Sequence, residues 1–356
     1  MSRFLSQQFA SLTPYTPGEQ PRDQRYVKLN TNESPFPPSP GVLRAVAEES
    51  VRLNLYCDPE CTLLRQAAAE LYGVEPQNVL PVNGSDEALY FTFLAFGDSA
   101  HPFAYPEISY GFYPVFAKLT HVLAREIPLK SGFTVDYKDY LGIKEHIVIA
   151  NPNAPTGVCL SVGEIEQIVR ANPDRVVVID EAYIDFGGES CVPLVNRYDN
   201  LLVIQTFSKS RSLAGARLGF AVGSEELIRD LNTIKYSVNP YNVNRMTQAA
   251  GVAAIEDDAY YKANAQTIIK TREATARRLT ELGFTVLPSK ANFLFAGNGA
   301  IGGEALYREL KTRGVLVRHF TKERIQNFCR ITIGTDEQME ILLTHIEAIL
   351  NTKGCE

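Results

Sequence analysis

Short runs of apolar residues, each followed by a polar turn, recur along most of the chain. The runs at 147–150, 176–179 and 201–204 each hold four consecutive apolar residues, a pattern typical of parallel strands buried on both faces. Between about residue 63 and residue 223, stretches with helical spacing alternate with such runs. The pattern predicts an α/β protein with a mostly parallel, doubly wound sheet.

Two further parts are expected around this large domain. The first forty residues are rich in Pro, Asn, Thr and Ser, which suits an arm lying over another surface, and a helix is expected to start after Pro40. The predicted parts are an arm at 1–40, a large domain at 41–245 and a small C-terminal α/β domain at 246–356. A long amphipathic helix is expected at 260–282 and a final helix ending at Leu350. In the small domain we expect strands at 284–288, 292–297, 315–320 and 329–334 and a helix at 303–314.

Chemically active side chains follow the predicted strands. Lys209 stands between Ser208 and Ser210, where a strand stops and a helix is expected to begin, and Asp180 ends the run at 176–179. Taken singly, they would be a surface lysine and a helix-capping carboxylate. The carboxyl ends of strands in an open α/β sheet face one crevice, so we expect the two side chains to meet there. A desolvated lysine has a lowered pKa and becomes a nucleophile.

A second feature is the helix start at residues 84–87. Gly84 lets the backbone approach a ligand closely, and the first N–H groups of the helix, beginning near Ser85 and Asp86, suit a phosphate. The same residues also fit an ordinary capped helix, since acidic side chains in the first turn satisfy the helix dipole.

Five motifs occur in the order found in fold-type I aminotransferases that depend on pyridoxal phosphate. They are NGSDEAL, NPNAPTG, DEAYIDF, FSKSRSLAGARLGF and FCRITIGT. The chain resembles this family over almost its whole length. PYTPGE, KLNTNESPFPPSP, NLYCDPE and GVLVRHF make it most similar to the histidinol-phosphate branch. The motif order is more specific for the cofactor and fold than for the substrate.

The resemblance implies pyridoxal 5'-phosphate as the cofactor and a role for each motif. Lys209 would form a Schiff base with the cofactor and then move a proton at the substrate Cα. Asp180 would keep the ring nitrogen protonated, Tyr183 would bond the phenolic oxygen, and Tyr110 would stack on the ring. The implied phosphate ligands are Gly84, Ser85, Asp86, Ser208 and Arg217, joined by Tyr56 from the other subunit of a homodimer.

One position departs from the family pattern. The family usually has an asparagine directly before Pro-Thr-Gly, where it contacts the phenolic oxygen, but this chain has Ala154 there and Asn153 one place earlier. Two alternatives stay open: the turn brings Asn153 into that role, or Tyr183 serves the oxygen alone.

The resemblance also implies a substrate. Arg330 and Arg318 would clamp a phosphate dianion, since two guanidiniums neutralise it and each donates in a fork, and Tyr15 would close over the site. The implied reaction converts L-histidinol phosphate and 2-oxoglutarate to imidazole acetol phosphate and L-glutamate in histidine biosynthesis. Threonine-phosphate decarboxylase, an aromatic amino-acid aminotransferase and a carbon–sulfur lyase are the nearest alternatives.

Composition changes this picture little. The chain has 356 residues, is 45% hydrophobic and carries a net charge of −6, so it offers no basic surface for nucleic acid. Its apolar runs are too short to span a membrane and its N-terminus lacks a continuous signal core, so we expect a cytoplasmic protein. Six scattered cysteines predict neither a disulfide framework nor a zinc site, and no metal is expected.

A rival interpretation comes from Gly297, Gly299 and Gly302, which match the G-x-G-x-x-G motif of NAD-dependent oxidoreductases. Only residues 303–356 follow, too few for a dinucleotide-binding sheet, and the next strand ends without the acidic residue that binds the ribose. A non-catalytic scaffold is a third interpretation. The presence of Lys209, Asp180 and Arg217 together argues against it, because a structural role requires neither the lysine nor the arginine.

Overall fold

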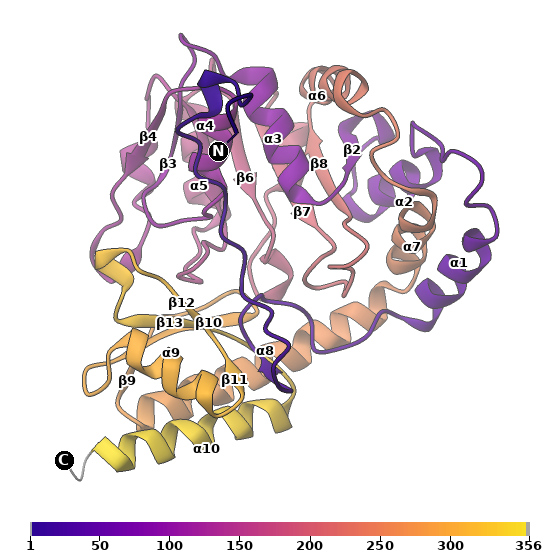
Figure 1. The fold of residues 1–356 in the computed structure, drawn as a ribbon. Coiled ribbons are helices and arrows are strands. Elements are labelled where there is room, and N and C mark those ends of the chain that lie inside the picture. Colours follow the sequence, from indigo (N-terminus) through magenta and orange to yellow (C-terminus); the bar gives the residue numbers. More distant parts are fainter. Residues whose placement is uncertain (1, 354–356) are drawn as a thin grey trace.

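A seven-stranded sheet forms the centre of the larger part of the computed structural model, which describes residues 2–353 (Figure 1). The strand order is β2-β8-β7-β6-β5-β3-β4. All pairs from β4 to β7 are parallel, while β8 runs antiparallel to both of its neighbours. This confirms the predicted mostly parallel sheet. The strands are β2 (Val79–Val82), β3 (Phe103–Pro106), β4 (Ala124–Ile127), β5 (His146–Ala150), β6 (Val177–Asp180), β7 (Leu201–Thr206) and β8 (Gly219–Gly223).

Helices cover both faces of this sheet (Figure 1). Ile147 and Ile149 of β5 enter one hydrophobic core, with α2, α5 and α7, while Val148 and Ala150 enter the other, with α3, α4 and α6. Both faces of the sheet are buried under helices, which explains why the strand residues are apolar throughout and do not alternate with polar ones. The helices are α1 (Pro40–Ser50), α2 (Thr62–Tyr72), α3 (Ser85–Phe96), α4 (Tyr113–Leu119), α5 (Val162–Ala171), α6 (Glu225–Val238) and α7 (Arg245–Glu256).

The smaller part is a four-stranded antiparallel sheet in the order β12-β13-β10-β9, packed against three helices. Because β10, which contains Gly297, pairs antiparallel with both neighbours, it lacks the parallel unit that a dinucleotide site needs. The elements are β9 (Phe284–Val286), β10 (Phe293–Asn298), β12 (Arg318–His319), β13 (Phe328–Thr332), α8 (Asp258–Glu281), α9 (Gly303–Thr312) and α10 (Asp336–Lys353).

Two expected elements of this part differ from the structure. The single strand predicted at 315–320 is divided: β11 (Val315–Leu316) pairs in parallel with β1 (Val27–Lys28), and β12 joins β13. The strand changes partner at Val317 because the N-terminal segment occupies its first half. The last helix continues to Lys353, three residues beyond the predicted end at Leu350.

Helix α8 passes from one hydrophobic core to the other. Its Tyr261 belongs to the core of the larger part, whereas Ala265, Ile268 and Leu279 belong to the core of the smaller one. Helix α7, which begins at the predicted boundary, packs in the large core against α1 and α2. We therefore propose that the boundary between the two parts lies within α8, and not at residues 245–246.

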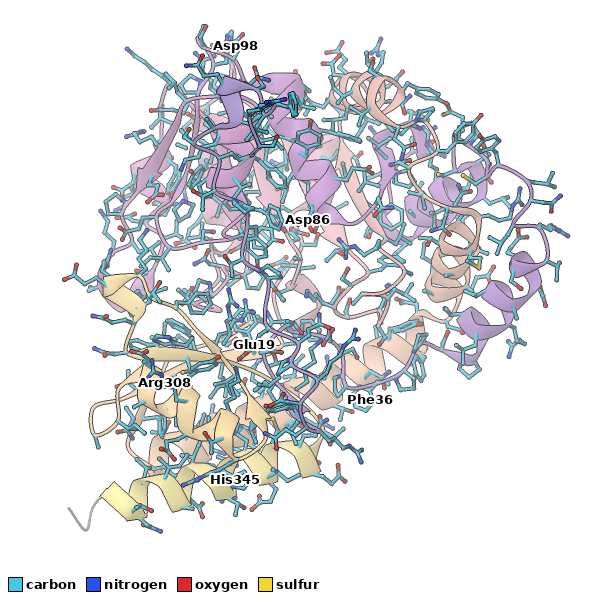
Figure 2. The ribbon with its side chains drawn as sticks, viewed as in Figure 1. Glu19, Phe36, Asp86, Asp98, Arg308 and His345 are labelled. Carbon is cyan, nitrogen blue, oxygen red and sulfur yellow. The ribbon has the colours of Figure 1, made fainter. Side chains whose placement is uncertain are left out.

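The N-terminal strap, residues 2–26, crosses the junction of the two parts (Figure 1). Tyr15 stacks on Phe112 of the large part with ring centroids 4.2 Å apart. Glu19 accepts bonds from Tyr307 and Lys311 of α9 and lies at the junction (Figure 2).

Short 3-10 helices lie at Gln7–Phe9, Pro76–Asn78, Ser131–Phe133, Tyr137–Tyr140, Ile184–Phe186, Val192–Asn196 and Glu323–Ile325. Among residues 2–353, none of the helices combines the length and apolar character needed to cross a membrane.

Candidate active site

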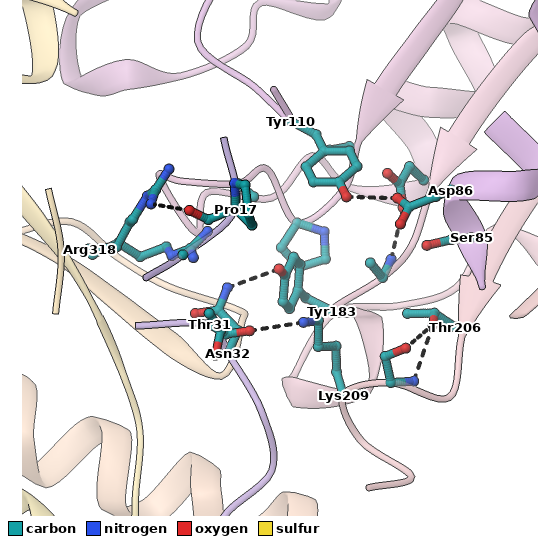
Figure 3. Close-up of a pocket in the computed structure, with 18 of the residues that line it drawn as sticks. Pro17, Thr31, Asn32, Ser85, Asp86, Tyr110, Tyr183, Thr206, Lys209 and Arg318 are labelled. Atoms are coloured by element: carbon teal, nitrogen blue, oxygen red, sulfur yellow. Dashed lines mark hydrogen bonds between the residues drawn. The ribbon is translucent and has the colours of Figure 1, made fainter. Parts of the chain in front are cut away.

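A cavity of about 220 Å³ opens where the ends of β5, β6 and β7 face the strap and the small sheet (Figure 3). This is the edge at which a doubly wound sheet binds its ligands. Most of the residues predicted from the sequence line it. These are Tyr15, Ser85, Asp86, Tyr110, Asp180, Tyr183, Ser208, Lys209, Arg217, Arg318 and Arg330.

Three predicted residues do not line the cavity. Gly84 is the N-cap of α3, directly before the lining residue Ser85. The side-chain amide of Asn153 donates to Ile108 O and to Thr156 Oγ1, so the idea that a shifted turn brings Asn153 into the site has no support in the structure. Tyr56 is 79% exposed on the outer surface.

Lys209 is held by a loop between two antiparallel strands. The helix expected after β7 does not form: residues 207–218 turn back directly into β8. Ser212 and Arg217 have φ angles of 55° and 57°, in the left-handed region that a right-handed helix cannot contain. Phe207 N–H closes the loop by bonding Leu218 O.

The amine of Lys209 has an unusual environment for a lysine. Its Nζ donates to the backbone oxygen of Thr31 at 3.1 Å and lies 5.9 Å from the centre of the Tyr183 ring. Burial, followed by the positive charge of Arg330, lowers the pKa of Lys209 to about 8. The predicted direction is confirmed, and the amine is partly uncharged at mildly alkaline pH.

Asp180, the last residue of β6, is 4% exposed. Its carboxylate accepts a 2.9 Å bond from the Tyr113 hydroxyl and a 3.2 Å bond from the Ala182 N–H. Burial raises the pKa of Asp180 to about 6, so the group is mainly ionised at neutral pH. Tyr113 was missed from the sequence, although it lies three residues after Tyr110 in a segment already assigned to the site.

One end of the cavity is suited to an anion. Arg217 donates to Ser208 Oγ at 3.2 Å and to Asp86 Oδ2 at 3.3 Å, and Tyr110 donates to Asp86 Oδ1 at 2.7 Å. The N-cap of α3 is a glycine without a capping side chain. The helix therefore presents uncapped N–H groups beside a guanidinium and a hydroxyl, a set of donors that matches a phosphate.

A second guanidinium lies toward the small sheet. Arg330 of β13 donates to Asn30 O at 3.0 Å and lies over the rings of Phe293 and Phe320, 5.4 and 5.8 Å from their centres. Its Nε is buried without a hydrogen-bond partner among the described residues. A buried unpaired donor on a cation is costly, so this group is prepared for an anionic ligand.

Arg318 has a different partner from the one expected. Its two terminal nitrogens donate to Thr16 O at 2.9 Å and Pro17 O at 3.1 Å, so in this structure it anchors the strap that carries Tyr15 (Figure 3). The predicted role as a phosphate clamp would require these bonds to be exchanged.

The segment Asn30–Asn32 supplies three cavity residues that sequence reasoning did not assign. It was noted only as a marker of the family branch. Its contacts reach Lys209, Tyr183 and Arg330, all more than 150 residues away, and no local pattern signals such contacts. Within residues 2–353, no group of three or more His, Cys, Asp and Glu side chains is arranged to hold a metal ion.

Comparison with known proteins agrees with this geometry. Residues 24–346 match the family model described as aminotransferase class I and II. The chain is 51% identical over 352 residues to histidinol-phosphate aminotransferase of Brachyspira hyodysenteriae, covering 98% of this chain and 99% of that protein. It is 51% identical over 340 residues to the protein of the same name from Acinetobacter baumannii, 94% of each chain. The fold is similar to the crystal structure of histidinol-phosphate aminotransferase from Sinorhizobium meliloti in complex with pyridoxal-5'-phosphate, with a TM-score of 0.84, 24% identity and 92% of each chain covered.

Proposed function

The chain belongs to the class I and II aminotransferase family, whose members use pyridoxal 5'-phosphate, and from this premise we propose that it transfers the amino group of L-histidinol phosphate to 2-oxoglutarate. The products would be imidazole acetol phosphate and L-glutamate, in histidine biosynthesis. One observation carries the proposal: the cavity that contains Lys209 also contains arginines in two separate places, Arg217 beside the start of α3 and Arg330, with Arg318, on the small sheet. A phosphorylated cofactor and a phosphorylated substrate would need one each.

The residues present fit the cofactor. Its aldehyde, ring nitrogen, phenolic oxygen and phosphate each find a complementary group in Lys209, Asp180, Tyr183 and the Ser208–Arg217 pair. Gly84 adds an independent sign, since a Cβ at this position would lie 2.3 Å from the Arg217 guanidinium. Because Gly84 has no side chain, the Arg217 guanidinium packs against its backbone beside the uncapped start of α3. The absence of a side chain there leaves room for an anion.

When bound, the cofactor supplies a covalent anchor for the substrate nitrogen and a cationic ring that accepts the electron pair left at the substrate Cα. We propose that Nζ of Lys209 removes the Cα proton. Asp180 would hold the proton on the ring nitrogen, because a buried carboxylate ionised at neutral pH stabilises the adjacent positive charge. Tyr110 would cover the ring and Tyr183 would donate to its phenolic oxygen.

We propose that Arg330 binds the phosphate of the substrate and that the strap excludes water above it. The unpaired Nε of Arg330 and the nearby ring of Tyr15 support this assignment. Arg318 would either keep holding the strap closed or turn from Thr16 and Pro17 to the phosphate.

We further propose that the enzyme is a homodimer. Large apolar side chains are exposed on the α1–α2 connection, at the start of α2, and at and just after the end of α6, and Tyr56 stacks on Tyr241. Such a patch on a globular protein marks an interaction surface. A second copy covering it would allow Tyr56 of each copy to reach the phosphate bound by the other. The exposed residues are Val51, Leu53, Leu55, Tyr56, Leu63, Tyr236, Val238 and Tyr241.

We place the reaction in the cytoplasm. Support comes from the five described cysteines, all of which are free thiols, as expected in a reducing compartment; the sixth, Cys355, lies outside the described residues.

A half-reaction panel tests the substrate assignment. Enzyme loaded with cofactor is mixed with histidinol phosphate, phenylalanine, tyrosine or threonine phosphate, and the visible absorption of the cofactor is followed. We expect rapid loss with histidinol phosphate and slow or no loss with the others. Faster conversion by an aromatic amino acid, or release of CO₂ from threonine phosphate, would instead support one of the alternative activities.

A further inference from the structure

Asn32 is a buried asparagine whose polar groups are all engaged. Its N–H donates to Thr332 Oγ1 at 3.0 Å, its Oδ1 accepts from the same hydroxyl at 2.9 Å, and its backbone oxygen accepts from Asn292 at 2.9 Å. Its side-chain Nδ2 donates to the Tyr183 hydroxyl at 2.9 Å. These contacts fix the orientation of the amide, since only its nitrogen end is left to face Tyr183.

The backbone at Asn32 is also unusual. Its φ angle is 57° and the residue is 1% exposed. The left-handed conformation is uncommon for residues other than glycine, and asparagine is among the few side chains that adopt it readily. The three bonds to Thr332 and Asn292 hold this conformation in place, so the amide is pre-oriented before any ligand arrives.

The direction of the Asn32–Tyr183 bond decides where the tyrosine proton points. A phenol has one proton and an oxygen that accepts. The oxygen of Tyr183 accepts from Asn32, and no acceptor among residues 2–353 takes its proton, so that O–H is free to donate into the cavity that Tyr183 lines (Figure 3). Donation toward the oxygen also polarises the O–H and strengthens it as a donor.

Position 154 makes this bond more important in this chain. Ala154 lines the cavity but has no polar side-chain atom, and the Asn153 amide is committed elsewhere. Tyr183 is therefore the side chain left to serve the phenolic oxygen, and its proton must be aimed correctly.

We infer that Asn32 is a positioning residue for the reaction: its amide turns the Tyr183 hydroxyl toward the phenolic oxygen of the cofactor and takes over the support that Ala154 cannot give. This deepens the proposed function and depends on pyridoxal phosphate as the cofactor, although not on which amine is the substrate. Thr332, two residues from Arg330 on β13, ties Asn32 to the strand that carries the substrate-binding arginine.

Asn32→Asp is the sharpest test, because it replaces only the amide nitrogen and tolerates the same backbone conformation. The new carboxylate still accepts from Thr332, but it cannot donate, so Tyr183 turns its proton toward it. We expect the affinity of the apoprotein for pyridoxal phosphate to fall about 5- to 10-fold, the loss of one hydrogen bond. The pH midpoint of the visible absorption of bound cofactor should rise by about one unit, because a weaker donor stabilises the deprotonated phenolic oxygen less.

A double-mutant cycle with Tyr183→Phe separates an action through Tyr183 from a direct one. If Asn32 works through the tyrosine, adding Asn32→Asp to Tyr183→Phe changes neither the dissociation constant nor the midpoint further. Additive effects in the cycle would overturn the inference, as would an unchanged midpoint in the single variant.

Two further variants protect the test against general destabilisation. Asn32→Gly removes the side chain without backbone strain; if Asn32→Asp does not fold, it should lower the affinity and raise the midpoint in the same directions but by less, because no carboxylate then draws the Tyr183 proton away from the cofactor. Asn78→Asp also loses one amide donor, to Gly223 O, but Asn78 lies directly before β2, at the end of that strand away from α3. This variant should leave cofactor binding unchanged. A shift in Asn78→Asp equal to that in Asn32→Asp would refute a specific role for Asn32. Failure of the wild type itself to bind pyridoxal phosphate would overturn both this inference and the proposed function, whereas normal binding with an unresponsive Asn32→Asp would overturn the inference alone.

Discussion

Two ionisable side chains of the cavity have pKa values moved toward neutrality from opposite sides. Burial lowers the pKa of Lys209 to about 8 and raises the pKa of Asp180 to about 6. The same desolvation acts on both, because it disfavours whichever form is charged. The next residue, Glu181, is also buried, but it bonds Ser190, the Cys191 N–H and Gln205 away from the cavity.

The pKa of Lys209 predicts the pH dependence of cofactor attachment. Only the uncharged amine attacks an aldehyde, so the rate at which apoprotein combines with pyridoxal phosphate should rise with pH and level off above about 8. Stopped-flow absorbance measures this rate. Arg330→Met should move the midpoint upward, because the arginine helps to lower the lysine pKa. A midpoint close to the ordinary lysine pKa of about 10.4 in the wild type would show that the lysine is not desolvated.

Arg330→Ala should affect substrate and cofactor differently. We expect KM for histidinol phosphate to rise at least about 10-fold, since a charge-assisted hydrogen bond contributes about 1.5–3 kcal/mol, while the visible absorption of bound cofactor is retained. Steady-state kinetics and absorption spectra of the same preparation check this. An unchanged KM would refute the phosphate assignment.

Asp180 should reduce the stability of the apoprotein. Its pKa is raised from 3.8 to about 6, so the stability associated with the protonated carboxyl is present below about pH 4 and lost as the pH rises through about 6. The corresponding cost at neutral pH is on the order of 3 kcal/mol. Asp180→Asn should therefore stabilise the apoprotein by about 1–2 kcal/mol at about pH 8, allowing for imperfect bonding of the new amide, and weaken cofactor binding.

Urea unfolding of the apoproteins at about pH 8 and about pH 4 measures that difference. The advantage of Asp180→Asn should disappear at the lower pH, where both side chains are neutral. A wild-type apoprotein that is the more stable of the two at the higher pH would contradict the expectation.

At the scale of elements, the site is built from segment ends. The end of β6 carries Asp180, the loop after β7 carries Lys209, and the start of α3 faces Arg217. Strand and helix ends leave backbone groups unpaired and free for ligands. The strap and the segment 30–32 then close the cavity from the other side.

Gly84→Ala should specifically impair the cofactor phosphate site. The new Cβ would lie 2.3 Å from Arg217 and the φ and ψ angles there are 77° and 160°, so the arginine must move and the backbone is strained by about 1–3 kcal/mol. We expect the dissociation constant for pyridoxal phosphate to rise, as measured by fluorescence titration of the apoprotein.

Gly73→Ala provides a control at another positive φ angle. Its φ angle is 67° and nothing lies within 4 Å of the added Cβ, so the left-handed backbone should lower its stability without altering cofactor affinity. Equal losses of affinity in both variants would mean that strain, and not the displacement of Arg217, is responsible.

At the scale of the whole molecule, the cavity lies between two parts, and the larger part carries an exposed apolar face. The net charge of −6 gives anionic ligands no overall attraction, so the local arginines must supply it. The proposed dimer would complete each phosphate site with Tyr56 from the other copy.

Mixing two impaired variants tests this arrangement. Lys209→Ala lacks the reactive amine, and Tyr56→Phe lacks the hydroxyl offered to the neighbour. A heterodimer of the two would contain one site with both groups intact, so mixing after mild dissociation should restore about a quarter of wild-type activity at limiting cofactor. Lys209→Ala mixed with itself serves as the control. No recovery, despite subunit exchange shown by mass measurement, would exclude a role for Tyr56 across the interface.

Much of this protein could be read from local patterns. The apolar runs determined the buried parallel strands, and the residues following them identified Asp180 and Lys209, because parallel topology brings successive strand ends to one edge. Gly84 and the first residues of α3 were recognisable for a similar reason, since helix starts have a defined chemistry that depends only on neighbouring residues.

Only the tertiary structure decided the rest. The loop around Lys209 replaced an expected helix, Asn153 turned away from the cavity, and Arg318 engaged the strap. Asn32 meets Thr332 across 300 residues of sequence. Contacts of this kind depend on how separate segments pack and on which hydrogen-bond donors are left unpaired when they pack. Neither the packing nor the unpaired donors produce a periodic pattern in the sequence.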